Sequence, residues 1–253
     1  MTLNKINTPE IVSRDKWLAA RKRLLVKEKE LTHARDALNA SRRRLPMVEI
    51  DKQYVFEGPS GKTSLIDMFD SRRQLIVYHF MFHPDWEEGC PICTAWTDER
   101  SAGELSHLHS RDTSFALVSR APFDKIKAHK ALKGWTIPWY SSYDNDFNYD
   151  FNVTLDSSVT PVVYNFQTQA GHRKKGTEYY FEGEQPIELP GMSCFLHDDN
   201  RIFHTYSTYG RGGESIGGAY YFLDLTALGR QEKWEEPKGR VATPHIAVPN
   251  FSS

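Results

Sequence analysis

The longest continuous run of apolar positions lies near the middle of the chain. It covers residues 75–82, where β-branched and aromatic residues follow one another almost without polar interruption. Such a run is typical of a strand that is buried on both faces. A polar loop follows at residues 83–89, and the sequence CPIC at residues 90–93 then opens a segment with helical character. This pattern predicts a central strand, a loop, and two cysteines at the start of a helix.

The positions around this run predict that strands and helices alternate. Residues 14–45 contain no Gly or Pro and carry apolar residues at helical spacing, which predicts one helix of about 30 residues. The alternation after it implies a mainly parallel sheet with helices on both faces. Strands are expected at residues 48–56, 75–82, 115–118 and 135–142, and helices at residues 63–69, 94–110 and 124–132.

The second half of the chain is less regular. Residues 144–189 show no sustained period and are interpreted as an irregular insertion. Two strands at residues 191–197 and 201–206 flank a polar turn and predict a hairpin, and residues 215–228 predict a final helix. The expected organisation is an N-terminal arm with a basic helix (1–46), an α/β domain with the insertion (47–230) and a C-terminal tail (231–253).

Composition favours a folded protein without general attraction to nucleic acids or membranes. The 253 residues are 39% hydrophobic and carry a net charge of −1, which suits a packed core and gives no long-range pull on polyanions. Three cysteines are too few for a disulfide scaffold and favour a reducing compartment. No stretch approaches the roughly 18 apolar residues of a membrane span. We therefore expect a cytoplasmic protein.

Positive charge is concentrated in the predicted N-terminal helix. Residues 14–44 contain eleven Lys and Arg residues but only four Asp and Glu residues. A narrow apolar stripe on a basic helix is typical of a solvated helix that packs on its own domain or on a second copy of the chain, so a homodimer is one expected assembly. A nucleic-acid contact through residues 42–44 is disfavoured, because no groove-reading motif accompanies the charge.

The order of elements and the position of the CxxC pair resemble the thioredoxin superfamily. Members carry a Pro, usually cis, that enters a later strand, with a Phe five residues further on, and Pro190 and Phe195 have this relation. The resemblance implies a thioredoxin-like α/β fold, a central mixed sheet flanked by helices, in which Pro190 packs against the loop of Cys90 and Cys93.

Several sequence blocks are similar to one bacterial family, known as thioredoxin family proteins or domain of unknown function 899. The similarity covers residues 10–230 and includes the blocks LIVYHFMFHPDWEEGCPIC, PGMSCF and FHTYSTYGRG. It implies the fold, but it implies no substrate, because the family has no defined reaction.

The CPIC sequence favours thiol–disulfide exchange. Two cysteines separated by two residues at a helix start can form a disulfide, and the outer one, Cys90, is the expected nucleophile, with Cys93 resolving the mixed disulfide. A disulfide substrate or glutathione is the expected partner, and no cofactor is expected. Pro91 resembles the CPxC of glutaredoxins. The carboxylates of Asp85, Glu87 and Glu88 argue against a stable Cys90 thiolate.

Three alternatives compete with this chemistry. The cysteines could be structural residues only. A peroxiredoxin-like peroxidase is disfavoured, because Glu87 stands where a Thr would orient the peroxide. A Cys/His metal site could include His79 or His83, but no second CxxC or HxxxH pair is present. No metal ligand is therefore assigned.

A non-enzymatic binding or assembly module is a further hypothesis. Tyr206, Tyr209 and Arg211 could line a pocket near Pro190, in which the arginine would meet an anionic ligand. Trp86, four residues before Cys90, is the remaining candidate for substrate contact, together with Pro91.

Overall fold

The computed structural model describes residues 9–218, 225–226, 232–234, 236 and 238. The chain divides after Pro46 into two compact units, one containing the N-terminal helix and the other residues 47–218. None of the helices in the described part combines the length and the hydropathy needed to cross a bilayer.

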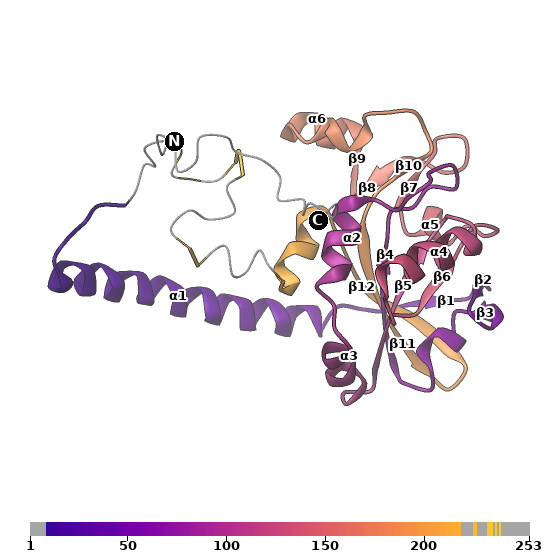
Figure 1. Ribbon diagram of the computed structural model, residues 1–253, viewed down its shortest axis with the longest axis horizontal. Coiled ribbons are helices and arrows are strands. Elements are labelled where there is room, and N and C mark those ends of the chain that lie inside the picture. Colours follow the sequence, from indigo (N-terminus) through magenta and orange to yellow (C-terminus); the bar gives the residue numbers. More distant parts are fainter. Residues whose placement is uncertain (1–8, 219–224, 227–231, 235, 237, 239–253) are drawn as a thin grey trace. The chain divides into compact units, whose positions relative to one another are not determined.

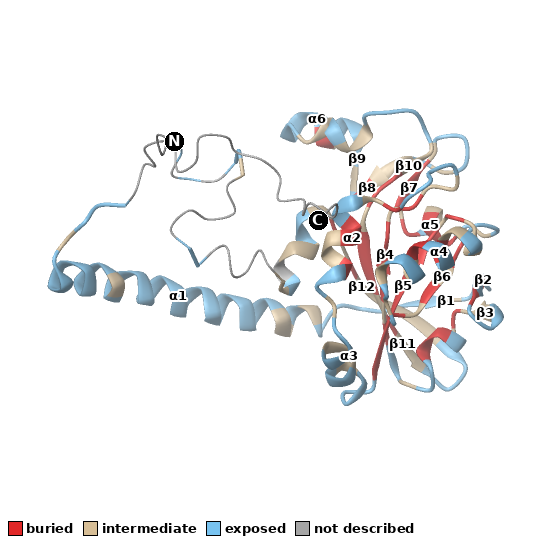
Figure 2. Cartoon of the chain, in the orientation of Figure 1, coloured by how far each residue is buried: buried red, intermediate tan, exposed pale blue. Residues whose placement is uncertain are grey.

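The first unit contains the long helix α1 (Arg14–Arg42). It begins where the side chain of Ser13 accepts a hydrogen bond from the N–H of Lys16 at 3.4 Å, which satisfies one of the free amides of the first turn. No residue of α1 is buried (Figure 2). The single long helix predicted from the sequence is confirmed.

The second unit is built on an eight-stranded mixed sheet with the order β1-β12-β11-β4-β5-β6-β2-β3 (Figure 1). Its central strands β4, β5 and β6 run parallel, and β11 and β12 form an antiparallel hairpin beside β4. Helix α4 leads from β5 back to β6. The strand bounds are β1 Val48–Ile50, β2 Val55–Gly58, β3 Gly61–Ser64, β4 Gln74–His79, β5 Thr113–Ser119, β6 Trp139–Ser141, β11 Gly191–Asp198 and β12 Arg201–Tyr209; α4 is Phe123–Lys133.

This arrangement is a thioredoxin-like fold, as predicted. The strand that leads to the dithiol lies between a parallel neighbour and an antiparallel hairpin, and side chains cover both faces of the sheet. One core cluster contains Leu75, Val77 and Phe195, and a second contains Tyr78, Phe80 and Cys93. Alternate residues of β4 therefore enter opposite layers, which explains why its sequence is apolar throughout.

Three predicted elements differ from the structure. The strand expected at residues 48–56 is two strands, β1 and β2, on opposite sides of the sheet order, because the polar residues 51–53 lie between them. Residues 63–69 form the end of β3 and a 3-10 helix, η1 (Asp67–Phe69). The helix expected at 94–110 is interrupted, because Ser101 caps a second helix through the N–H of Glu104; the two helices are α2 (Pro91–Asp98) and α3 (Ala102–His109).

The insertion at residues 144–189 contains short elements that the sequence pattern did not show. They are α5 (Phe147–Asp150), β7 (Thr154–Leu155) paired with β10 (Ile187–Glu188), β8 (Val163–Tyr164) paired with β9 (Gln167–Thr168), α6 (Gln169–Lys175) and the 3-10 helix η2 (Glu178–Phe181). The cis peptide bond expected at Pro190 is wrong: among the described residues it is Gln185–Pro186 that is cis.

The hairpin predicted after the insertion is confirmed, and both of its strands extend further than expected. The helix predicted at residues 215–228 lies mostly outside the described residues. Its first residues belong to a 3-10 helix, η3 (Gly210–Ile216).

Candidate dithiol site

The dithiol lies at the start of α2, after the loop that follows β4. Cys90 is the N-cap residue and Pro91 the first helical residue, where the missing N–H of proline has no cost. The N–H of Cys90 donates to the carbonyl of Met81 at 2.9 Å, and the N–H of Thr94 donates to the carbonyl of Cys90 at 2.9 Å. Both cysteines are free thiols. The local backbone therefore places a reduced dithiol at a helix N-terminus.

The environment of the Cys90 sulfur stabilises its charged form. The pKa of Cys90 falls from 9.0 to about 6, chiefly because the Cys93 thiol donates a hydrogen bond to it. Partial burial opposes this, and the backbone N–H groups of Cys93 and Ile92 lower the pKa further. Cys90 is half-buried, whereas the next two residues are exposed. The thiolate, which is the reactive form, can thus be reached from solvent.

Cys93 has the opposite environment. It is only 1% exposed, and burial, followed by the neighbouring Cys90, raises its pKa well above the usual range. The hydroxyl of Tyr78 donates a hydrogen bond to the Cys93 sulfur, which acts in the opposite direction. The two cysteines therefore differ strongly: one is accessible and readily ionised, and the other is enclosed and neutral.

Tyr78 was not singled out from the sequence. It lies on β4 and stacks on Trp96 of α2, with ring centroids 4.2 Å apart. The apolar run around it marks it as a core residue, and it is indeed buried. The signal that could have found it is the period of two along the strand, because this period puts Tyr78 on the same face as Phe80 and hence under the dithiol helix.

The acidic residues before Cys90 do not act on it as the sequence suggests. The side chains of Asp85 and Glu87 are 91% and 92% exposed, and no carboxylate is among the causes that shift the pKa of Cys90. The ammonium of Lys125 donates to two carbonyls of this loop at 3.0 and 2.9 Å and lies 3.6 Å from Glu87. The expected acidic suppression of the thiolate is wrong, because these side chains face water while backbone amides face the sulfur.

His129 of α4 and Phe80, the residue after β4, contact Gly89, the residue before Cys90. The N–H of Gly89 donates to Nδ1 of His129 at 3.5 Å, and Nε2 of His129 lies 3.4 Å from the hydroxyl of Thr94. Burial lowers the pKa of His129, so its ring is neutral near pH 7. A Cβ atom on Gly89 would lie 2.6 Å from Cε1 of Phe80. The close approach of loop and ring therefore requires glycine at this position.

Pro190 lies at the end of the sheet from which the dithiol loop leaves. The residue after it, Gly191, pairs with His79, the last residue of β4, and with Tyr209, the last residue of β12. The predicted site residues Pro190 and Tyr209 are thus neighbours in the fold. The hydroxyl of Tyr209 donates to the carbonyl of Phe151 at 3.0 Å, which holds its ring in place.

The insertion contributes Tyr164 to this end of the sheet. Its hydroxyl donates to the carbonyl of Pro190 at 2.8 Å and accepts from the N–H of Gly210 at 2.9 Å. Burial raises the pKa of Tyr164, and the hydrogen bond from the N–H of Gly210 opposes this effect. Sequence reasoning missed Tyr164, because nothing in an irregular segment indicates where its side chains lie.

A buried ion pair attaches the insertion to the end of β5. Nη1 of Arg120 lies 2.8 Å from Oε1 of Glu188, and Thr154 donates to the other carboxylate oxygen at 2.9 Å. Burial raises the pKa of Glu188 to about 7, although Arg120 and Thr154 favour the charged form. The guanidinium also lies over the ring of Tyr149, 4.9 Å from its centroid.

The remaining predicted site residues have partners of their own. Tyr206 lies opposite Cys194 in the β11–β12 register. Nε of Arg211 lies 3.2 Å from a carboxylate oxygen of Glu214, so this arginine already has an anionic partner. Trp86 is 37% exposed in the loop before the dithiol.

Of the two histidines considered as metal ligands, His79 lies in the core, and His83 is half-buried in the loop before the dithiol. Nε2 of His79 lies 2.8 Å from the hydroxyl of Ser193, and its ring packs beside Phe147 and Phe151. In the part of the chain that the structure describes, no group of three or more His, Cys, Asp or Glu side chains is placed to hold a metal ion. The Cys/His alternative has no ligand set there.

With this geometry established, comparison with known proteins identifies the family. A model of the family described as "Bacterial protein of unknown function (DUF899)" matches residues 6–245. The chain belongs to this family. The resemblance drawn from the CPIC and FHTYSTYGRG blocks is thereby confirmed. None of the curated proteins compared with this DUF899 chain matches it.

Solved structures with distant similarity to this DUF899 protein include peroxiredoxins and a member of a family of cytochrome c oxidase assembly proteins. A cysteine mutant of Xanthomonas campestris peroxiredoxin Q is 12% identical, with 64% of this chain and 86% of that chain covered and a TM-score of 0.41. A Xylella fastidiosa PrxQ mutant is 11% identical, with 64% and 84% covered and a TM-score of 0.39. BsSco, of the Sco family of cytochrome c oxidase assembly proteins, is 14% identical, with 64% and 85% covered and a TM-score of 0.34.

Proposed function

We propose that this protein is a thiol–disulfide oxidoreductase in which Cys90 is the nucleophile and Cys93 the resolving thiol. The observation that carries the proposal is the asymmetry of the two sulfurs. Cys90 is accessible at a helix N-terminus and receives hydrogen bonds from one thiol and two backbone amides, whereas Cys93 is enclosed. A low-pKa outer thiol beside a buried inner thiol is the arrangement that disulfide exchange requires.

The reaction begins with attack of the Cys90 thiolate on one sulfur of a substrate disulfide. A Cys90–substrate disulfide forms, the substrate S–S bond breaks, and the other substrate sulfur leaves as a thiolate. Once Cys90 is uncharged, the repulsion that raises the pKa of Cys93 is removed, while the hydrogen bond from Tyr78 still favours the Cys93 thiolate. This thiolate then attacks the sulfur of Cys90 and releases the second substrate thiolate.

The net reaction moves two electrons from the dithiol to the substrate and leaves a Cys90–Cys93 disulfide. The released thiolates take protons from the two cysteines by way of solvent. A small dithiol or a second dithiol protein must then reduce Cys90–Cys93 by the reverse exchange. Lys125, His129 and Gly89 act as positioning residues in this scheme, because they hold the loop that carries the nucleophile.

Single cysteine variants test this proposal. With a dithiol reductant in excess, wild-type protein should accelerate insulin-disulfide reduction. Cys90→Ser should remove the acceleration, and Cys93→Ser should accumulate a mixed disulfide visible by mass spectrometry. Cys194→Ser is the matched control and should retain activity, since burial raises the pKa of Cys194 to about 11. The proposal would be refuted if wild-type protein reduced neither insulin nor glutathione disulfide faster than the reductant alone does.

A further inference from the structure

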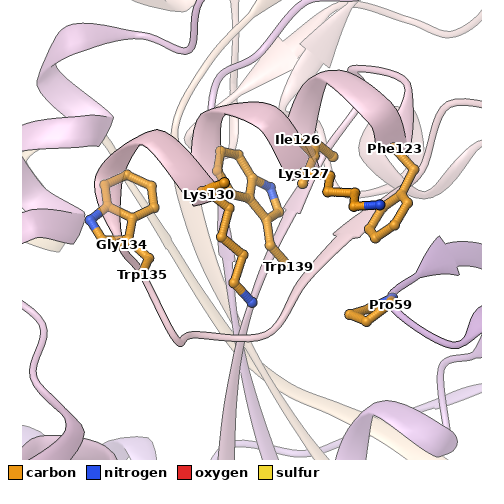
Figure 3. Close-up of a pocket in the computed structure, with 9 residues that line it drawn as sticks. Pro59, Phe123, Ile126, Lys127, Lys130, Gly134, Trp135 and Trp139 are labelled. Carbon is orange, nitrogen blue, oxygen red and sulfur yellow. The ribbon is translucent and has the colours of Figure 1, made fainter.

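A cavity of about 490 Å³ lies beside α4, on the side of the turn that joins β2 and β3. Trp135, Trp139, Phe123 and Ile126 line it, and Pro59 from the turn closes one side (Figure 3). Its volume falls in the range of small-molecule sites, which are mostly apolar with a few placed polar groups. The thiol chemistry proposed above does not use this cavity.

The aromatic wall of the cavity presents ring surfaces and no free side-chain donor. The indole N–H of Trp135 donates to Asp98 at 2.8 Å, and that of Trp139 donates to the hydroxyl of Ser119 at 2.9 Å. Both indole donors are therefore satisfied outside the cavity. A ligand here would meet flat, polarisable faces, which favours a flat apolar or aromatic body.

Two ammonium groups complete the lining. Lys127 and Lys130 follow one another by three residues on α4, so both lie on the side of the helix that borders the cavity, and Figure 3 shows both side chains at the cavity. No carboxylate of the described residues pairs with either ammonium group. Burial also lowers the pKa of Lys130, as is typical of a cation that has lost hydration without gaining a counter-ion.

We propose that this cavity binds a small organic anion with a flat aromatic body, such as an aromatic carboxylate. The ring would lie against the tryptophan faces, and the carboxylate would accept charge-assisted hydrogen bonds from Lys130 and Lys127. An inorganic anion would gain nothing from the indoles, and an organic cation would be repelled by both lysines. The combination of an aromatic wall with two cations that have no carboxylate partner among the described residues thus selects for both features at once.

Calorimetric titration with naphthoate, uncharged naphthamide and the cation naphthylmethylammonium tests this site. Naphthoate should bind about tenfold more tightly than naphthamide at low salt, the cation should not bind, and added salt should weaken naphthoate alone. Lys130→Met and the Lys127→Met/Lys130→Met double variant should reduce the naphthoate preference towards one.

Lys62→Met is the matched control. Lys62 lies in the β2–β3 hairpin, close to Pro59, but it is exposed and is not part of the cavity lining. Its substitution removes one positive charge, as Lys130→Met does, and should leave the preference for naphthoate unchanged. Thermal unfolding should show that all variants are folded. Equal binding of naphthoate and naphthamide, absence of saturable naphthoate binding, or an equal loss in Lys62→Met would each overturn the proposal.

Discussion

The dithiol segment (residues 75–96) and the insertion (residues 144–189) meet at the same end of the sheet but are held there by different interactions. In the dithiol segment, backbone hydrogen bonds between near neighbours place the sulfurs, as in the bond from Cys90 to Met81, and side chains of α4 only support the loop. In the insertion, single side chains reach distant residues, as Tyr164 reaches Pro190 and Gly210. Local geometry therefore sets the reactivity of the thiols, and long-range side-chain contacts set the surroundings.

The largest expected effect comes from removing Tyr164. This ring is fully buried and its hydroxyl joins two backbone groups. Tyr164→Ala should lower the free energy of unfolding by about 3–5 kcal/mol, because it leaves a cavity in the core. Tyr164→Phe keeps the ring and removes only the hydroxyl, so it should lower the free energy of unfolding by about 1–3 kcal/mol. Urea unfolding measures both. Tyr143→Phe, at a 52% exposed tyrosine, should change nothing; equal losses in both Phe variants would break the comparison.

The anchor of the insertion at Glu188 predicts a pH effect. Its folded pKa of about 7 lies above the ordinary 4.5, so the native state binds more protons between these values and the free energy of unfolding falls as pH rises through this window. Glu188→Gln does not titrate. Its stability relative to wild type should therefore rise by about 3 kcal/mol between about pH 4 and pH 8. Glu184→Gln, at an exposed position, should show no such trend.

A pH-independent difference between Glu188→Gln and wild type would contradict this account. It would mean that the ion pair with Arg120 compensates fully for the burial of the carboxylate.

A smaller effect is expected in the loop of the dithiol segment. Gly89→Ala would bring a Cβ atom into the ring of Phe80 and should lower the free energy of unfolding by about 1–3 kcal/mol. It should also slow alkylation of Cys90, because the backbone that carries the sulfur must move. Gly103→Ala on α3 is the control, since its nearest neighbour would be 3.7 Å away. A Gly89→Ala protein as stable as Gly103→Ala would show that the loop is not tightly held.

The smallest effect concerns the hydroxyl of Tyr78. Tyr78→Phe removes the hydrogen bond to Cys93 and should slow the resolution of a mixed disulfide by up to about tenfold, which corresponds to about 1.4 kcal/mol. The alkylation rate of Cys90 should stay the same. Stopped-flow measurement of glutathione release separates the two steps, and an effect on alkylation alone would place Tyr78 in a different role.

The same contrast explains what could be predicted from the sequence. The apolar run at residues 75–82 and the following CPIC specify a buried strand and a helix-start dithiol, because both depend on neighbours in the chain. The positions of Tyr164 and Glu188 depend on partners such as Gly210 and Arg120, which are far away in sequence. Periodicity carries no information about such contacts, so the sequence predicts only an irregular segment there.

The acidic loop shows a second limit of sequence reasoning. Asp85 and Glu87 are close to Cys90 in the chain, yet their side chains are almost fully exposed. Charge that is near in sequence acts on a thiol only where the side chain faces it. The sequence supplied the residues of the dithiol, but the sign of its electrostatic environment required the structure.

The pH dependence of Cys90 alkylation tests the central claim most directly. Iodoacetamide modification of the Cys90 peptide, followed by mass spectrometry in the Cys194→Ser background, yields the pKa of this thiol. The account predicts a midpoint near the value of about 6 and a higher midpoint in Cys93→Ala, which has no side-chain donor for the Cys90 sulfur. A midpoint at the ordinary 9.0, unchanged in Cys93→Ala, would contradict it.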